Sequence, residues 1–322
     1  MKNKKIFAWS ITVALAGFLF GFDTVVISGA DLELQKLWPQ GDWFHGFVVM
    51  SSALWGTVIG AIFGGIPTEK LGRKKTLIII GILYSLSAIG AALVSDPFSF
   101  AFFRFIGGLG VGASTIAGPA YISEIAPAEN RGKLVGTYQF NIVFGILVAF
   151  LSNYLISEAI QNDAWRYMIG IEAIPAIIYT LMVLSVPESP RWLITAKNDT
   201  AEATKVLSQI YPTEEVPAVI KSIQDNNEAA AKGESIFMEK YQFPLRLAFL
   251  IAFFNQFSGI SVHWVLAAII PAMVPVLFAK LGQGPVFYFF AFMMFLQLIF
   301  VYKMMPETKG VVLEEMQDSL GQ

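Results

Sequence analysis

The sequence of 322 residues contains no cysteine and only two histidines, His45 and His263. Without cysteine the chain forms no disulfide, uses no catalytic thiol and holds no cysteine-ligated metal. The two histidines are too few and too isolated to build a metal cluster, so packing or interfacial roles are favoured for both. The sequence therefore predicts neither a metal site nor a resident cofactor.

Charge is also scarce. Asp, Glu, Lys and Arg make up 14% of the residues, whereas a soluble globular protein has about 25%. Apolar residues make up 55%, and the formal net charge of −2 argues against a nucleic-acid partner. No nucleophile–base pair or phosphate loop is recognisable, so an enzyme is not expected. The composition predicts an all-α polytopic membrane protein embedded in a lipid bilayer.

Apolar runs of the length needed to cross a membrane recur along the chain, since a spanning helix needs about 20 apolar residues. The basic N-terminus with Ser28-Gly29-Ala30 also allows a cleaved signal peptide, but the long first run and the spans after it favour a retained helix. Short connections make the first helices antiparallel neighbours. The predicted spans are 6–29, 45–66, 76–95, 98–120, 133–157 and 165–186, followed by a long run at 244–281 and a last span at 284–305.

The distribution of basic residues predicts the orientation. Most of the 22 Lys and Arg residues fall in segments that lie on one side of the membrane if the N-terminus is inside, and basic residues mark cytoplasmic loops. Both termini are therefore expected in the cytoplasm. The predicted division is an N-terminal six-helix bundle at 1–186, a cytoplasmic linker with short helices at 187–243, a C-terminal membrane part at 244–305 and a cytoplasmic tail at 306–322.

Two charged residues stand inside apolar runs. A charge in the hydrocarbon costs several kcal/mol unless it meets a partner or water. With the first helix ending near Gly29, Asp23 lies six residues below its outer end, and Arg104 lies six residues into the run that starts at Phe98. At about 1.5 Å per residue both lie about 9 Å below the same face. The sequence predicts that Asp23 and Arg104 pair.

Glycines and short charged motifs lie at the predicted helix interfaces and inner helix ends. Gly56, Gly60 and Gly64 repeat at the small-xxx-small spacing that lets helix backbones approach each other. A Pro-Glu-Ser motif follows the sixth span and a Pro-Glu-Thr motif follows the last one. The charged motifs occupy 65–74, 127–132, 187–193 and 306–310, and two further segments, 17–30 and 104–112, complete the set.

Together these segments resemble the sugar porter family of the major facilitator superfamily, over nearly the whole chain. The resemblance implies two six-helix halves that rock around a central site and expose it alternately to each side. It implies secondary active transport of a hexose or pentose across the cytoplasmic membrane, with symport of a proton. It also implies that protonation of Asp23 releases Arg104 and lets the loaded carrier reorient; the alternative is a static ion pair in a facilitator without proton coupling.

The same resemblance implies a sugar site and a cytoplasmic gate. Amide groups and an aromatic face suit a sugar ring. Opposite charges at the inner helix ends can lock one conformation through charge-assisted hydrogen bonds; the alternative is a topology signal with solvated helix ends. The implied sugar-binding residues are Gln139, Asn255, Gln256 and Trp264, and the implied gate residues are Glu69, Arg73, Glu124, Arg131, Glu188 and Arg191.

Three residues need separate comment. Glu69 stands where the family usually carries aspartate. Phe22 replaces a common tyrosine, so no hydroxyl is expected beside Asp23. Glu172 is also intramembrane, and a helix-packing role near Trp165 and Arg166 is predicted for it.

The chain is too short for the twelve spans that the family implies, at about 20 residues each. The segment 255–260 resembles the seventh helix of the family, and 261–264 resembles the eleventh. The run 244–281 is therefore expected to fuse these two helices, which leaves about eight spans and a truncated C-terminal half. A transport-inactive remnant is the further alternative, and the sequence leaves the sugar and the oligomeric state open.

Overall fold

The computed structural model describes residues 2–127, 129–230, 242–243, 246–247, 249–250 and 283–304. The regular structure in these residues is helical, without strands. The chain divides into two compact units, Met1–Gln224 and Asp225–Gln322. Most of the expected fused helix at 244–281 lies outside the described residues.

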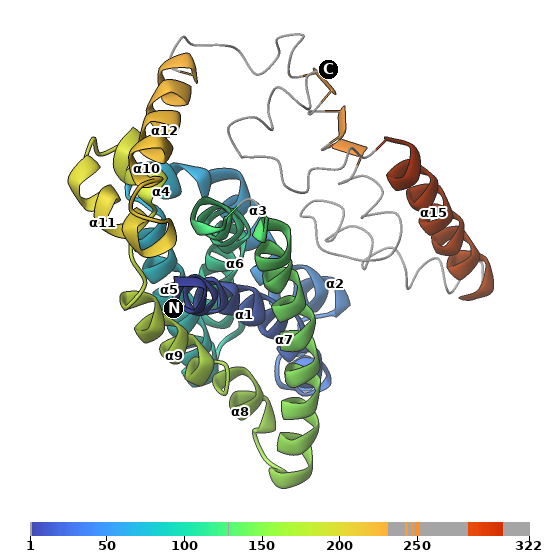
Figure 1. Ribbon diagram of the computed structural model, residues 1–322. Coiled ribbons are helices and arrows are strands. Elements are labelled where there is room, and N and C mark those ends of the chain that lie inside the picture. Colours follow the sequence, from blue (N-terminus) through green and yellow to red (C-terminus); the bar gives the residue numbers. More distant parts are fainter. Residues whose placement is uncertain are drawn as a thin grey trace. The chain divides into compact units, whose positions relative to one another are not determined.

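The first unit is a bundle of apolar helices followed by short polar ones (Figure 1). Helix α1 packs against α6 and α7, α6 packs against α3 and α5, and α5 packs against α9. The elements are α1 (Lys2–Leu37), α2 (Asp42–Phe44), the π-helix η1 (His45–Met50), α3 (Ser52–Phe63), α4 (Gly65–Lys70), α5 (Arg73–Leu93), α6 (Pro97–Ile125), α7 (Arg131–Ala159), α8 (Ala164–Gly170), α9 (Ala173–Leu184), α10 (Pro190–Thr195) and α11 (Thr200–Ile210), and α12 (Val216–Ala230) begins in this unit and ends in the second.

Five helices in the described part of the chain are long and apolar enough to cross a membrane, and Ser52–Phe63 is a shorter apolar helix. The predicted fold class, an all-α membrane bundle, is confirmed. The second predicted span is divided into η1, α3 and α4. Its C-terminal part is interrupted at Gly64, three residues before Pro67, because glycine is a weak helix former and proline lacks an amide donor.

Helix α1 is longer than the sequence predicts. The predicted end near Gly29 is wrong, because the helix continues to Leu37. Gly29 packs against the side chain of Asn153 on α7, whose Nδ2 donates to the Val26 carbonyl at 3.0 Å. Ala30 and Leu34 of this extension are buried, whereas Leu32 is exposed. Burial against neighbouring helices therefore carries α1 two turns further than its own apolar run.

Helices α3 and α6 approach closely through glycine. A Cβ on Gly56, Gly60 or Gly64 would overlap the backbone of α6, and a Cβ on Gly112 would overlap the Thr57 carbonyl of α3. The predicted packing role of the glycines in 56–64 is confirmed. Glycine at this helix interface lets the backbones of α3 and α6 contact each other directly.

An aromatic cluster joins the C-terminal end of α1 to the start of α6 and to α8. The ring centroids of Trp38 and Phe100 are 5.3 Å apart, and Trp165 lies 5.8 Å from Trp38 and 5.9 Å from Phe100. Phe100 and Arg104 are one helical turn apart and therefore share a face of α6. The cluster thus holds the face of α6 that carries Arg104 against α1.

The polar segment after α9 forms short helices, as predicted. The Ser189 hydroxyl caps α10 by accepting from the Trp192 amide at 3.2 Å, and Asp199 caps α11 by accepting from the Glu202 amide at 3.0 Å. Helix α11 buries an apolar face. The Lys5 ammonium at the start of α1 donates to the Gln209 side chain at 3.0 Å. These contacts place α11 beside the beginning of α1.

The second unit contains α15 (Gln283–Met304), which coincides with the predicted last span. Met293 and Phe300 are buried, whereas Tyr302 is exposed.

We expect Gly112→Ala to lower the free energy of unfolding by about 1–3 kcal/mol, because the new methyl group forces α3 and α6 apart. Gly136→Ala on α7 is the matched control, since nothing lies within 4 Å of its Cβ position; there alanine should leave stability unchanged or raise it by up to about 1 kcal/mol. Thermal unfolding of the purified chain in detergent measures both. Equal stability of the two variants would contradict the packing role of Gly112.

Candidate functional site

Asp23 on α1 and Arg104 on α6 are in direct contact inside the bundle. Arg104 donates through Nη1 to Asp23 Oδ1 and through Nη2 to the Asp23 backbone carbonyl at 3.0 Å. Asp23 is 2% exposed and Arg104 is 1% exposed. Losing one member of such a buried pair leaves an uncompensated charge, at a cost of about 3–5 kcal/mol. Because Nη1 and Nη2 of Arg104 both donate to Asp23, the orientation of the guanidinium over Asp23 is fixed.

Glu172 is a third ionisable group at the same place. It lies between α8 and α9, is 1% exposed, and interacts electrostatically with both Asp23 and Arg104. No donor group of the described residues contacts its carboxyl oxygens, but its carboxyl and that of Asp23 are close enough to share a hydrogen bond when one of them is protonated. The sequence predicts a packing role for it near Trp165 and Arg166, whereas the structure places it beside the ion pair. The sequence did carry a signal for Glu172. It is an acid inside an apolar run, the same feature that pointed to Asp23.

The buried cluster of Asp23, Arg104 and Glu172 holds two acids and one base. With both acids ionised it carries one net negative charge in a low-dielectric interior, where an unbalanced charge is costly. The described part of the chain has no group of at least 3 His, Asp or Glu side chains placed to hold a metal ion. The arrangement is instead suited to gaining and losing a proton.

A tyrosine hydroxyl belongs to the same surroundings. Phe22 is buried and offers no hydroxyl, but Tyr84 on α5 is fully buried and interacts electrostatically with Asp23 and Glu172. The Tyr84 hydroxyl makes no hydrogen bond to Asp23, so it acts on that acid through its electrostatic interaction alone. Ser87, one turn further along α5, is also buried, and its side chain packs against Gly107 of α6.

Buried hydroxyls continue from Tyr84 toward α7. The hydroxyls of Ser114 on α6 and Tyr138 on α7 are 3.0 Å apart, and Tyr84 interacts electrostatically with Tyr138. Tyr138 precedes Gln139, whose side chain is exposed on α7. The other predicted sugar-binding residues lie outside the described residues; they are Asn255, Gln256 and Trp264.

The strongest contact among the predicted gate residues joins Arg73 at the start of α5 to Glu124 near the end of α6. Arg73 Nη2 lies 2.9 Å from Glu124 Oε1, and its Nε lies 3.1 Å from Oε2. The Ser189 hydroxyl donates to the same carboxylate at 2.5 Å, and Arg73 Nη1 donates to the Thr68 carbonyl at 3.2 Å. The two-pronged geometry is typical of strong arginine–carboxylate pairs.

Glu188 connects the α4–α5 turn to α10. Its Oε1 accepts from the Lys74 amide at 3.0 Å and from the Ser189 amide at 2.9 Å. Gly72 lies in this turn with φ +96°, and a Cβ there would overlap the Glu188 carboxylate. The turn needs glycine both for its backbone conformation and for the close approach of Glu188.

The remaining gate residues differ in their surroundings. Arg191 lies among Glu124, Arg131 and Arg73; burial lowers the pKa of its guanidinium, while the Glu124 carboxylate raises it. Arg131 donates to the Ser123 carbonyl at 3.2 Å. The side chain of Glu69 makes no hydrogen bond or ion pair with the described residues, and only its backbone carbonyl accepts from Trp192, at 2.6 Å. The Glu69 carboxylate therefore stands apart from the network.

Comparison with protein families gives one match over most of the chain. Residues 9–263 and 260–320 match the model of the family described as "Sugar (and other) transporter". The glucose transport protein of Synechocystis is 41% identical over 221 residues, which cover 66% of this chain and 47% of that protein. The D-xylose-proton symporter of Escherichia coli K12 is 32% identical over 295 residues, covering 80% of this chain and 58% of that protein. The chain thus spans about half the length of the curated relatives it matches.

Solved structures agree with this assignment. The proton:xylose symporter XylE bound to 6-bromo-6-deoxy-D-glucose superposes with a TM-score of 0.72 at 29% identity, covering 99% of this chain and 69% of that chain. The inward-open conformation of XylE from E. coli superposes with a TM-score of 0.68 at 31% identity, covering 84% of this chain and 64% of that chain.

We expect a double-mutant cycle of Arg73→Ala and Glu124→Ala to give a coupling free energy of about 1–3 kcal/mol, because both side chains are largely shielded from water. Their exposed fractions are 16% and 7%. The control cycle uses Lys205 and Glu202 on α11, which are also paired but are 72% and 49% exposed; it should show no coupling above measurement error. Chemical unfolding in detergent supplies the free energies. Equal coupling in the two cycles would rule out a special role for the Arg73–Glu124 pair.

Proposed function

We propose that this chain, which belongs to the family of sugar (and other) transporters, carries a monosaccharide across the cytoplasmic membrane in symport with a proton. The substrate is a hexose or pentose, moved by alternating access. The observation that carries the proposal is the buried cluster of Asp23, Arg104 and Glu172. The named activities of the glucose and xylose carriers among its relatives support the choice of substrate class.

The charge balance of the cluster supports a proton as the coupling ion. One proton on either acid makes the cluster neutral. Protonation of Asp23 removes the charge that holds the Arg104 guanidinium, and Glu172 then lies at hand as the second acceptor for that guanidinium. The ion pair can thus exchange partners without exposing a charge to lipid, which keeps the cost of reorientation low.

The hydroxyl groups between the cluster and α7 support a link to sugar binding. We assign Gln139, Asn255, Gln256 and Trp264 to the sugar site. A sugar held by Gln139 acts on the neighbouring Tyr138, whose hydroxyl lies 3.0 Å from that of Ser114. Tyr84 interacts electrostatically with Tyr138 and with the two acids. This route gives sugar binding a physical path to the protonation of Asp23.

The charged contacts at the inner helix ends support a gate. The proposal assigns closure on the cytoplasmic side to Arg73, Glu124, Arg131, Glu188 and Arg191, with Glu69 at the edge of the network. Breaking the Arg73–Glu124 pair opens that side. Both termini are placed in the cytoplasm, with membrane parts at 1–186 and 244–305, a linker at 187–243 and a tail at 306–322.

We expect the purified chain in proteoliposomes to exchange labelled glucose or xylose in counterflow and to accumulate it when the outside is acidified. Asp23→Asn removes the titratable group but keeps its size and polarity, so exchange should continue while pH-driven accumulation is lost. Labelled-sugar uptake with and without a pH gradient measures both. Retained pH-driven accumulation in the variant would refute Asp23 as the proton site. No exchange of either sugar by correctly inserted protein would count against transport of these sugars.

Glu172→Gln tests the second acid. The substitution removes one negative charge beside Asp23, which makes the remaining cluster neutral with Asp23 ionised. Exchange should persist, and accumulation should require a more acidic outside than in the parent chain, because the proton is bound less readily. Glu158→Gln, at an exposed position near the end of α7, is the matched control and should leave the pH profile unchanged. An unaltered pH profile in the Glu172→Gln variant would mean that Glu172 has only a packing role.

A further inference from the structure

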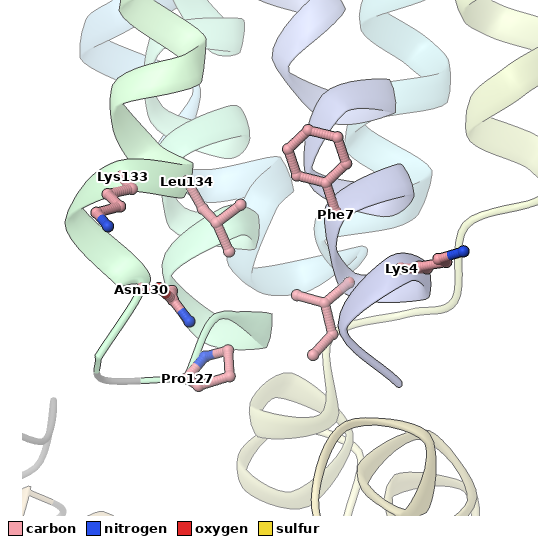
Figure 2. A pocket seen from close by; sticks show the side chains of 7 residues that line it. Lys4, Phe7, Pro127, Asn130, Lys133 and Leu134 are labelled. Atoms are coloured by element: carbon pink, nitrogen blue, oxygen red, sulfur yellow. The ribbon is translucent and has the colours of Figure 1, made fainter. Parts of the chain in front are cut away.

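A cavity of about 370 Å³ lies between the first turns of α1 and α7, next to the turn that joins α6 to α7. Figure 2 shows Phe7 of α1 and Leu134 of α7 extending toward each other across it, with Asn130 at its edge and Pro127 at its base. Lys4 and Lys133 lie on opposite sides of the cavity, and in this view both ammonium groups point away from it. The transport proposal uses none of these residues.

The lining has two kinds of chemistry. The side chains of Ile6, Phe7, Pro127 and Leu134 are apolar, whereas the polar groups come from three other lining residues. A sugar needs several hydrogen-bonding groups directed at one ring. Here the polar groups sit at the margin and the wall is hydrocarbon, so the cavity suits a ligand with a polar head and an apolar tail. The polar lining residues are Lys4, Asn130 and Lys133.

Positive charge surrounds the opening. Lys4 and Lys133 make no ion pair with the described residues, and both are exposed. Lys5 follows Lys4, and its ammonium is bonded to a neutral side chain on α11. Glu129 is the exposed acid in the adjoining turn. The charge at the opening is therefore positive and complements an anion.

The depth of the lysines matches a lipid headgroup. Lys4 stands just before the apolar run that opens at Ile6, and Lys133 stands just before the one that continues from Leu134. Lysine at such a boundary keeps its ammonium in the polar layer while its stem lies along apolar surface. Asn130 precedes α7 without capping it through its side chain. Its amide is therefore available to a ligand at the same depth.

We propose that this cavity binds an acidic phospholipid of the cytoplasmic leaflet. The headgroup phosphate lies at the Asn130 amide on the cavity margin, where the exposed side chains of Lys4 and Lys133 turn toward it from either side, and an acyl chain follows Phe7 and Leu134. Basic pockets between helices on the cytoplasmic side attract acidic lipids. The inference rests on the orientation given in the proposed function. The bound lipid joins the inner ends of α1 and α7, the helices that carry Asp23 and Tyr138.

The test measures lipid binding to the full chain in neutral detergent by native mass spectrometry, comparing phosphatidylglycerol with phosphatidylcholine. The variant is the double substitution Lys4→Gln and Lys133→Gln. The control is the double substitution Lys70→Gln and Lys75→Gln, which removes the same charge from exposed lysines in the inner segment at 65–75. Circular dichroism and melting in detergent without lipid check that both variants are folded.

We expect the parent chain to prefer phosphatidylglycerol and the Lys4/Lys133 variant to bind it roughly 30-fold more weakly, since each lysine near an acidic lipid contributes roughly fivefold in affinity. The Lys70/Lys75 variant should bind like the parent. Phe7→Ser should weaken binding of the long-chain lipid without affecting its short-chain analogue. Equal losses in the two double variants, or equal binding of phosphatidylcholine by the parent, would overturn the proposal.

Excess inorganic phosphate and glycerol 3-phosphate separate a lipid from a soluble anion. If either displaces phosphatidylglycerol completely, the cavity takes a free phosphate and the lipid assignment is wrong. If neither does, the acyl chain contributes to binding as proposed. The measurement needs no sugar and no proton gradient, so its failure is distinguishable from a failure of transport.

Discussion

The structure depends on placing an arginine and an aspartate in contact inside an apolar bundle. Desolvating two charges is expensive, and their attraction offsets that cost only when the geometry is close and fixed. Arg104 meets this condition by donating to both the side chain and the backbone of Asp23. The surrounding bundle serves this contact: the aromatic cluster of Trp38, Phe100 and Trp165 holds α6 against α1.

Helix α6 carries both charged centres of the first unit. Arg104 takes part in the buried cluster and Glu124 in the network at the inner end; at about 1.5 Å per residue they stand roughly 30 Å apart along the helix. The glycine seam with α3 lies between them and lets the two helices move as one packed pair. A change in the buried cluster can therefore reach the C-terminal end of α6 through a rigid element, as the proposed alternating access requires.

Helices α1 and α7 have a complementary role. Helix α7 brings the Tyr138 hydroxyl to Ser114 of α6, and the first turns of α1 and α7 enclose the cavity between Phe7 and Leu134. The proposed sites for sugar, proton and lipid thus lie at three different positions along the same few helices. Because these helices pack through backbone and small side chains, a displacement at one level is not absorbed by flexible side chains at another.

The sequence by itself determined the membrane class and the pairing of Asp23 with Arg104, because composition, apolar run length and an isolated charge are local properties of the chain. The resemblance of its short motifs indicated the family. The tertiary structure alone placed Glu172 beside that pair and brought the Tyr84 hydroxyl in from α5. It also extended α1 beyond Gly29 and left the Glu69 carboxylate outside the gate network. The physical reason is the same each time: the direction in which a buried side chain points is decided by packing against helices distant in sequence, which periodicity does not encode.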